Sequence, residues 1–325
     1  MQELINRIFS IQSDADFESC ALDVYRYQRE HIPVYNQFVT LLSRKEPETI
    51  SDIPFLPISF FKTHDVIHKN GGSNPSVIFK SSGTTGMARS KHLVADVSLY
   101  ERSFHATYQQ FIGRPEDQVI LALLPNYIEQ GESSLVYMVD HLIKKSGNPI
   151  SGFYLDSFEQ LLSAVEKARK TGKKIVLFGV SYALLDLAEL NPDLSDVLVI
   201  ETGGMKGRRK EMTKEELHET LKNGFGAPYI SSEYGMSELL SQAYSDKDGL
   251  FELPAWMRVR LRDVNDPMSA VISGKTGGVD VIDLANIYSC AFISTQDLGK
   301  ITDGKLQLMG RFDLADIRGC NLLVQ

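Results

Sequence analysis

The chain has 325 residues, of which 43% are hydrophobic and 23% are charged, and its formal net charge at pH 7 is −8. These values are typical of a globular protein, and the acidic balance argues against a nucleic-acid-binding surface. No signal-peptide pattern opens the sequence, and no apolar run reaches the ~20 residues of a membrane span, so we expect a cytoplasmic protein. Cys20, Cys290 and Cys320 form no C-x-x-C pair, which predicts reduced thiols.

The first part of the chain predicts helices. Residues 1–48 carry apolar residues at helical spacing, and we expect a helical lead-in over 1–75. Within it, two prolines interrupt the apolar segment "DIPFLPISFFKTHDVI". Because proline disrupts a helix, this segment predicts an extended piece laid across a core surface.

The rest of the chain predicts sheets. Over 76–245, β-branched runs such as "QVILALLP" and "DVLVIETGG" alternate with amphipathic segments, which indicates a buried, mostly parallel sheet with flanking helices. Over 246–325, short strands with Gly or Asp turns predict a β-rich portion. We therefore expect one α/β domain over 1–325, with layered sheet subdomains and helices on their faces.

The run "FKSSGTTGMARSKH" at 79–92 concentrates hydroxyls and glycines between a strand-like and a helix-like segment, and Arg89, Lys91 and His92 follow them. Freed backbone N–H groups, hydroxyl donors and nearby cations together make a phosphate cradle. Neither a Walker A loop nor a G-x-G-x-x-G fingerprint occurs in the sequence. By composition alone, the run also fits a plain flexible loop.

Two other patterns compete for a function. His64 and His68 are four residues apart, as in helical zinc sites, but a glutamate and a third ligand are missing from the segment, which favours hydrogen-bonded histidines. "GVSYA" at 179–183 resembles a nucleophile elbow around Ser181. The later histidine, His218, is far from the end of the sequence, which suits a hydrolase poorly, so we expect Ser181 to line an acyl or adenine pocket.

"SSGTTG" resembles the phosphate loop of the adenylate-forming superfamily, which contains acyl- and aryl-CoA ligases, luciferases and peptide-synthetase adenylation domains. Three further segments follow in the order of that superfamily: "YGMSE" at 234–238, "TQDLG" at 295–299 and "GRFDLADIRG" at 310–319. The resemblance implies the fold of the superfamily's large N-terminal domain. It also implies ATP and Mg²⁺ as cofactors.

The resemblance implies a role for each matching residue. The residues that would close over the ATP phosphates are Ser81, Ser82, Gly83, Thr84, Thr85 and Gly86. Those that would contact the rest of the nucleotide are Tyr234 at adenine, Gly203, Gly204 and Gly235 in the backbone that approaches it, Ser237 at the α-phosphate, and Asp297 and Arg311 at the ribose. Glu238 would hold Mg²⁺. Taken singly, Tyr234 also fits a core aromatic residue and Glu238 a helix-start acid.

Several positions depart from the superfamily pattern. Ala88, Arg89 and Ser90 stand where Pro, Lys and Gly are usual, and Ser237, Gln296 and Arg318 replace Thr, Gly and Lys. The hinge-like segment lies close to the end of the given sequence, so we expect the superfamily's small C-terminal domain, with its catalytic lysine, to be absent. We expect adenylation without that lysine, or a positive charge from a partner protein or from Arg89 or Lys91.

"IPFLPISFFKTH" and "LLPNYIEQGESSLVYM" resemble the LuxE-type acyl-protein synthetases more narrowly. This resemblance implies activation of a fatty acid, transfer to a cysteine thiol near the C-terminus, here Cys320, and delivery to an acyl reductase partner. Without it, Cys320 fits a small buried hydrophobic residue. The alternatives are an acyl- or aryl-CoA ligase and an inactive nucleotide-binding partner of an acyl reductase.

Overall fold

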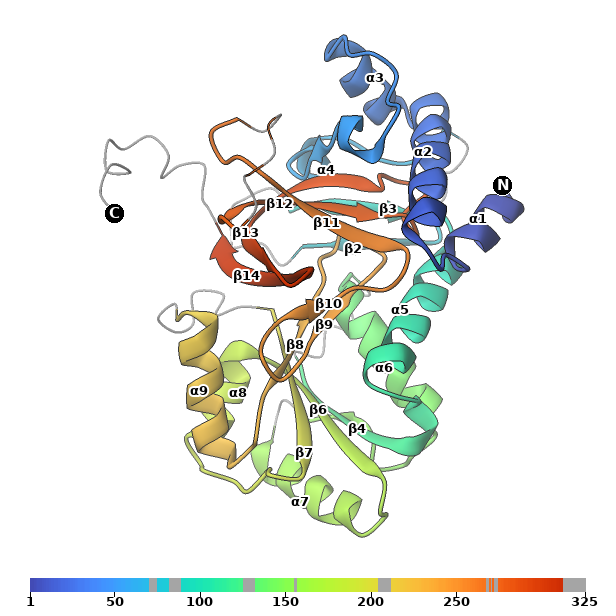
Figure 1. Cartoon of the computed structure of the whole chain (residues 1–325). Helices are drawn as coiled ribbons and strands as arrows, with labels where there is room; N and C mark the ends of the chain where they lie inside the picture. The colour runs from blue at the N-terminus through green and yellow to red at the C-terminus, as the bar shows by residue number, and fades with distance from the viewer. Residues whose placement is uncertain are drawn as a thin grey trace.

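Helices form the N-terminal layer, as the sequence predicts (blue in Figure 1). The computed structural model describes residues 1–69, 75–81, 89–124, 132–154, 157–203, 212–266, 269, 271 and 274–311. The first helices are α1 (Gln2–Ile8), α2 (Asp14–His31), α3 (Pro33–Leu41) and the short α4 (Phe60–Thr63), with a 3₁₀ turn at Ile50–Asp52. A capping box of Ser13 and Asp16 fixes the start of α2 by satisfying free N–H groups. The proline-rich segment is extended at β1 (Leu56–Pro57), as expected.

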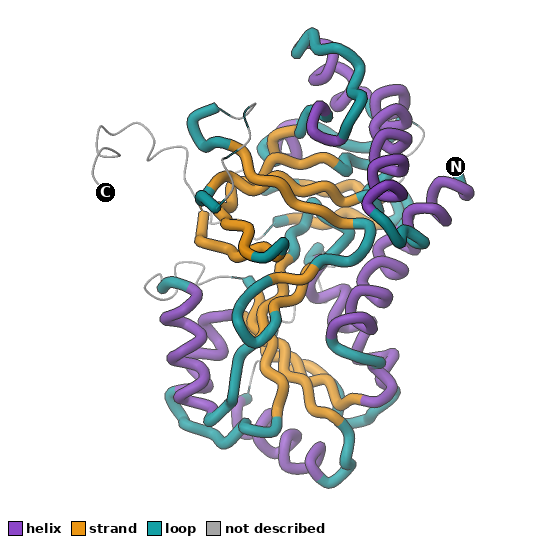
Figure 2. The backbone as a smooth tube through the Cα atoms, viewed as in Figure 1, coloured by secondary structure: helices purple, strands orange, loops and turns teal. Residues whose placement is uncertain are grey.

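Parallel strands form the lower half of the molecule (Figure 2). They are β4 (Gln118–Leu123), β5 (Gly152–Phe153), β6 (Lys174–Val180), β7 (Val197–Thr202) and β8 (Ser231–Tyr234), and all their mutual pairings are parallel. The helices around them are α5 (Val97–Phe111), α6 (Ser134–Ser146), α7 (Phe158–Arg169), α8 (Ser181–Ala188) and α9 (Lys214–Phe225), with a 3₁₀ turn at Pro115–Asp117. Every residue of β4 is buried, which explains the unbroken apolar run that follows Gln118.

Antiparallel strands form the β-rich part that the sequence predicts after residue 245. They are β9 (Ala243–Ser245), β10 (Phe251–Glu252), β11 (Met257–Arg262), β12 (Gly277–Asp283), β13 (Phe292–Thr302) and β14 (Lys305–Arg311). The strand order β11-β12-β13-β14-β10-β9-β8-β7-β6-β4-β5 joins both halves into one path of hydrogen bonds, and β1 adds to β13. β2 (Val77–Lys80) and β3 (Lys91–Val94) form a separate antiparallel pair.

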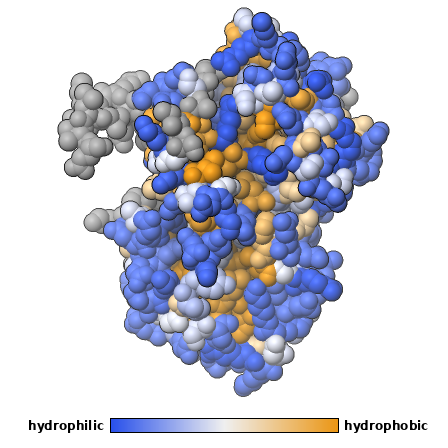
Figure 3. Space-filling view, in the orientation of Figure 1, coloured by the Kyte–Doolittle hydropathy of each residue, from blue (hydrophilic) through white to orange (hydrophobic). Residues whose placement is uncertain are grey.

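The two halves meet in the middle of the molecule, where Figure 3 shows an exposed hydrophobic patch. Buried side-chain hydrogen bonds also link distant segments. Gln28 of α2 is fully buried; its Nε2 donates to the carbonyls of Asn286 and Ile287 at 2.9 and 3.0 Å, and its Oε1 accepts from the N–H of Ala291 at 3.0 Å.

Among the described residues, no helix is both long and apolar enough to cross a membrane.

We predict that Gln28→Met destabilises the fold by about 2–5 kcal/mol. The thioether cannot replace the amide, so the carbonyl of Ile287 and the N–H of Ala291 lose their partner, whereas the carbonyl of Asn286 keeps the N–H of Ser289. Each unpaired buried group costs about 1–3 kcal/mol. Urea unfolding measures the change. Gln110→Met, at an exposed position of α5, is the control and should change stability by less than about 0.5 kcal/mol. Equal stability of the two variants would contradict this account.

Candidate functional site

The β2–β3 pair carries the two ends of the serine- and glycine-rich run. Ser81 and Ser90 close it: the N–H of Ser90 donates to Ser81 Oγ at 3.0 Å, and the N–H of Ser81 donates to the carbonyl of Ser90 at 3.1 Å. The run therefore leaves and re-enters the fold at one point. The expected site residues outside the described part of the chain are Ser82, Gly83, Thr84, Thr85, Gly86, Gly204 and Cys320.

The cations beside this run have carboxylate partners. Arg89 donates to the carbonyl of Ser81 at 2.6 Å and to Glu132 at 3.1 Å, and Lys80 pairs with the same Glu132. Lys91 pairs with Asp65 at 3.1 Å, and both side chains are exposed. An incoming anion would therefore compete with carboxylates for Arg89 and Lys91, and their catalytic role stays a prediction.

His92 requires a correction, because the sequence suggested a third cation. The ring is fully buried: its Nδ1 lies 2.8 Å from the carbonyl of Ser237, and its Nε2 lies 3.1 Å from Asn286 Oδ1. Burial lowers the pKa of His92 to about 4, so the ring is neutral at pH 7. His92 thus connects β3 to the "YGMSE" segment and offers no positive charge.

Tyr234, Asp297 and Arg311 lie together, as the superfamily motifs predict. The Tyr234 hydroxyl donates to Asp297 Oδ2 at 2.8 Å, and Arg311 Nε pairs with Asp297 Oδ1 at 3.0 Å. Asp297 and Arg311 are direct neighbours across β13 and β14. Tyr234 is buried and packs edge-on against Phe251, with ring centroids 5.9 Å apart. Stacking on adenine stays a prediction, since Tyr234 is at present held by Asp297.

Glu238 is buried close to this group. Burial raises the pKa of Glu238, whereas the Ser90 hydroxyl and the charge of Arg311 lower it. The carbonyl of Glu238 accepts from Asn286 Nδ2 at 2.8 Å. The phosphate-loop end, the "YGMSE" segment and the β13–β14 hairpin therefore meet at Glu238.

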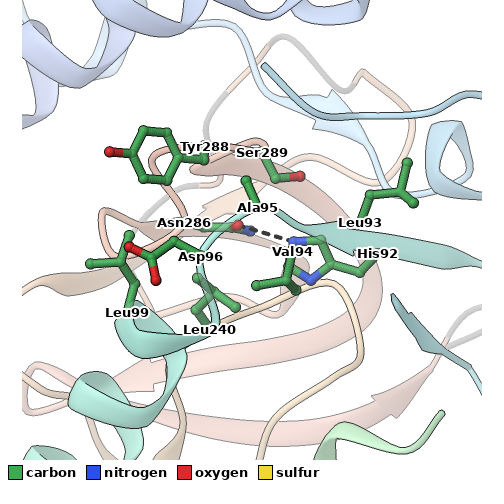
Figure 4. A pocket seen from close by; sticks show the side chains of 10 residues that line it. All are labelled: His92, Leu93, Val94, Ala95, Asp96, Leu99, Leu240, Asn286, Tyr288 and Ser289. Carbon is green, nitrogen blue, oxygen red and sulfur yellow. Dashed lines mark hydrogen bonds between the residues drawn. The ribbon is translucent and has the colours of Figure 1, made fainter. Parts of the chain in front are cut away.

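Asp283, at the end of β12, fixes the segment that follows Glu238. Its Oδ2 accepts from the N–H groups of Leu240 and Ser241 at 2.7 and 2.9 Å, and its Oδ1 accepts from the Ser241 hydroxyl at 2.6 Å. Figure 4 shows Leu240 beside His92 and Asn286, around a cavity of about 10 Å³ that has room for a single water molecule. The segment is thus held by side chains rather than by a strand.

A second carboxylate, Glu201, lies fully buried at the end of β7. It accepts from the hydroxyls of Ser181 and Ser232 and pairs with Lys214. Burial alone would raise the pKa of Glu201, but Lys214 and His218 lower it to about 2, so the side chain is ionised.

Gly203, two residues later, has φ +76°, a conformation that favours glycine where the backbone leaves the strand.

The hydrolase alternative finds no support here. Ser181 is buried and donates to Glu201, whereas the His218 ring contacts the Ser232 hydroxyl at 2.9 Å and has no contact with Ser181. A nucleophilic serine needs a base that can take up its proton, and Glu201, with its pKa lowered to about 2, is too weak a base for this role. His64 contacts the Thr63 hydroxyl, and the His68 ring lies 4.9 Å from that of Tyr288. Within the described ranges, no three or more His, Cys, Asp or Glu side chains gather in a way that could hold a metal ion.

Glu233 precedes Tyr234 on β8 and faces the other side of the sheet, where Thr202 donates to it. Burial raises the pKa of Glu233 to about 7, and the charge of Glu201 adds to the effect. Sequence reasoning missed Glu201 and Glu233. The one available signal was an acid inside each of the strand-like runs "VLVIETGG" and "SSEYG".

Solved structures with this architecture exist, although no family model and no curated protein matches the sequence. An open form of 2-hydroxyisobutyryl-CoA ligase, solved with 2-HIB-AMP and CoA, is 14% identical, with a TM-score of 0.64 over 93% of this chain and 71% of the ligase. The ATP-bound RpMatB-BxBclM chimera is 20% identical, with a TM-score of 0.54 over 72% of this chain. MenE from Bacillus subtilis, solved with AMP, is 18% identical, with a TM-score of 0.50 over 72% of this chain and 49% of MenE.

This chain has the fold of the large N-terminal domain of adenylate-forming enzymes. The expected fold class, including the large sheet with flanking helices, is therefore confirmed. The chain spans 47% of the length of the chimera, so the activity of a whole ligase does not follow from the fold.

We predict that the free energy of unfolding falls by about 3 kcal/mol between pH 4.5 and pH 7 through Glu233. Its pKa rises from 4.5 to about 7 on folding, so the unfolded chain releases this proton first, and the stabilisation present at low pH is lost as pH rises. Glu233→Gln should remove this loss, as measured by urea unfolding at several pH values. The control is Glu215→Gln at an exposed position of α9. A Glu233→Gln profile parallel to the wild-type profile would show that Glu233 keeps its ordinary pKa.

Proposed function

We propose that this protein activates a carboxylic acid with ATP, giving an acyl-adenylate and pyrophosphate, and then passes the acyl group to a thiol. The observation that carries the proposal is the meeting of Tyr234, Asp297 and Arg311 with Glu238. Three segments remote in sequence supply these residues. The fold, and the order of four superfamily-like motifs, support the same reaction.

The residues present suit a nucleotide. The two carboxylate oxygens of Asp297 can accept hydrogen bonds from the two hydroxyls of a ribose, and they now hold Tyr234 and Arg311 in that role. The Tyr234 ring offers a flat surface for a base. Binding would therefore exchange internal hydrogen bonds of Asp297 for hydrogen bonds to the ligand.

The residues also suit Mg²⁺. In nucleotide sites this ion takes one or two protein carboxylates and completes its shell with phosphate oxygens and water, so the single buried Glu238 is sufficient. When bound, the ion would offset charge on the phosphates. Glu238 would orient it beside the run that begins at Ser81, with Ser237 close to the α-phosphate.

The first step joins a carboxylate oxygen of the acid to the α-phosphorus and breaks the bond to pyrophosphate. Positioning and charge stabilisation carry most of such a reaction. Arg89 and Lys91 flank the run that would hold the phosphates, and we propose that their positive charges offset the negative charge that develops on the departing pyrophosphate. They would exchange Glu132 and Asp65 for phosphate oxygens.

In the second step a thiolate attacks the acyl carbon, and AMP departs. We propose Cys320 as the acceptor and a fatty acid as the acid, as the resemblance to LuxE-type acyl-protein synthetases implies, with an acyl reductase as the later partner. A second candidate function is that of a CoA ligase with coenzyme A as the acceptor, because the solved structures of this fold include CoA ligases. A third candidate function is that of an inactive nucleotide-binding partner of an acyl reductase.

One experiment separates these candidates. The protein is incubated with ATP, Mg²⁺ and a panel of carboxylic acids, with hydroxylamine as acceptor, and pyrophosphate is measured. Acid-dependent pyrophosphate release is the expected result, and its absence with every acid would leave the inactive partner. Adding coenzyme A instead of hydroxylamine then tests whether acyl-CoA is formed.

We predict different defects for Asp297→Asn and Glu238→Gln. Asp297→Asn removes the negative charge and one of the two oxygens that would accept hydrogen bonds from the ribose hydroxyls. We therefore expect the Kd for ATP to rise about 10-fold or more at every Mg²⁺ concentration. Glu238→Gln loses a charged oxygen ligand, so more Mg²⁺ should be needed for half-maximal pyrophosphate release. If both variants kept the Mg²⁺ dependence of the wild type, the assignment of Glu238 would be wrong.

We predict that Cys320→Ser loses a hydroxylamine-sensitive acyl label from radioactive acid and ATP, while hydroxylamine-dependent pyrophosphate release continues. Activation and transfer use different groups, so the first step should survive. Cys20→Ser and Cys290→Ser are the controls, because both thiols are free and buried. Acyl-CoA formation together with an unlabelled Cys320, by peptide mass mapping, would make the protein a CoA ligase.

A further inference from the structure

Three buried polar side chains lie together where β8 meets β9, and we call them the β8–β9 polar cluster: Glu233, Gln242 and Tyr244. Their exposed fractions are 8, 4 and 2%. Glu233 and Tyr244 are direct neighbours across the strand pair, and Gln242 stands two residues before Tyr244, so all three belong to one face of the sheet. Tyr234, at the nucleotide site, faces the other side.

Two atoms of this cluster have no hydrogen-bond partner in the described part of the chain: the Tyr244 hydroxyl oxygen and Gln242 Oε1. A buried polar group without a partner costs about 1–3 kcal/mol, and native proteins keep few of them. Glu233 adds a carboxyl group that accepts from Thr202. The cluster therefore has hydrogen-bonding capacity that these protein groups leave unused.

The cluster lies directly beside residues of the proposed nucleotide site. A Cβ atom on Gly235 would stand 2.4 Å from Glu233 Oε1 and 3.4 Å from Gln242 Cγ. Glycine at this position thus lets both side chains reach the end of β8, next to Tyr234. A molecule joined to the nucleotide at that strand end could extend toward the cluster.

Aromatic rings from α5 surround the cluster. The Tyr108 and Phe111 rings lie 6.2 and 6.5 Å from the Tyr244 ring, and Tyr100 is close enough for the charge of Glu233 to raise its pKa. Apolar side chains with a few convergent polar groups among them are typical of small-molecule sites. These rings suit contact with a hydrocarbon or aromatic tail, and the cluster suits a polar group on it.

We propose that the β8–β9 polar cluster binds a hydroxyl or amino group on the tail of the acid substrate, an inference that rests on the proposed function. Gln242 Oε1 can only accept a hydrogen bond, so the ligand must bring an N–H or O–H donor. The Tyr244 hydroxyl can donate to the same group. An unsubstituted hydrocarbon would leave Gln242 Oε1 and the Tyr244 hydroxyl unpaired. The substrate class is therefore hydroxy or amino carboxylic acids, which narrows the fatty acid proposed above to one that carries such a group on its tail.

The test compares matched acids in the hydroxylamine-dependent pyrophosphate assay. The pairs are alkanoic acids of four to ten carbons against their ω-hydroxy and ω-amino forms, and 3-phenylpropionate against 3-(4-hydroxyphenyl)propionate. For at least one pair, we expect kcat/KM for the polar acid to exceed that for its partner about 10- to 100-fold. Tyr244→Phe and Gln242→Met should each reduce this ratio about 10-fold or more, mainly by slowing the polar acid.

Tyr108→Phe is the matched control, because Tyr108 packs against Tyr244 but its hydroxyl already donates to Gln118. It should keep the preference for polar acids. Without substrate, thermal unfolding should show Tm lowered in Tyr108→Phe, because Gln118 Oε1 loses its donor. Tm should be unchanged or raised in Tyr244→Phe.

Unsubstituted acids that react as well as their polar partners would overturn the inference and leave the proposed function standing. A Tm loss in Tyr244→Phe as large as in Tyr108→Phe would also overturn it, because the hydroxyl would then have a partner such as a buried water. No pyrophosphate release with any acid would overturn the inference and the proposed function together.

Discussion

The buried carboxylate of Asp283 determines where the candidate site residues lie. It accepts three hydrogen bonds from the segment that follows Glu238, although it belongs to β12 and lies 42 or 43 residues later in the sequence than its partners. Burial raises the pKa of Asp283, and these bonds oppose the rise. The segment between β8 and β9 has few backbone bonds of its own, so this side chain sets its path and, with it, the positions of Ser237 and Glu238.

Other buried polar side chains extend the same connection. The side chain of Asn286 donates to the carbonyls of Glu238 and Cys290, and its backbone carbonyl accepts a hydrogen bond from Gln28 Nε2. The His92 ring contacts both Asn286 and Ser237. Helix α2, strand β3 and the end of β12 are thereby tied to one loop. Such bonds stabilise little in net terms, but each is expensive to leave unmade, so they specify one arrangement.

The sequence predicted what depends on local pattern. The apolar run of β4 is completely buried, and the order of the superfamily-like motifs led us to expect Tyr234, Asp297 and Arg311 in one site, where they touch. The lead-in helices and the β-rich end were equally predictable, because periodicity and turn residues are local signals.

Long-range polar contacts were beyond the sequence. Glu201 is the one acid of β7, and Asp283 is one of two acids in β12. Nothing near either residue in the chain identifies its partners, which are more than ten residues away. Because His92 follows Arg89 and Lys91 in the sequence, it was taken for a cation. Its charge state is set by burial against Asn286 and Ser237, and burial is a property of the tertiary fold.

The alternation of β8 has a consequence for how such a protein can diverge. Glu233 and Tyr234 are successive residues that face opposite sides of the sheet, so substitutions on one side leave the other chemically intact. Insertion or deletion of a single residue would instead exchange the two faces at once. Point mutations can therefore retune the Glu233 side while the Tyr234 side is conserved, whereas the length of this strand is under joint selection from both.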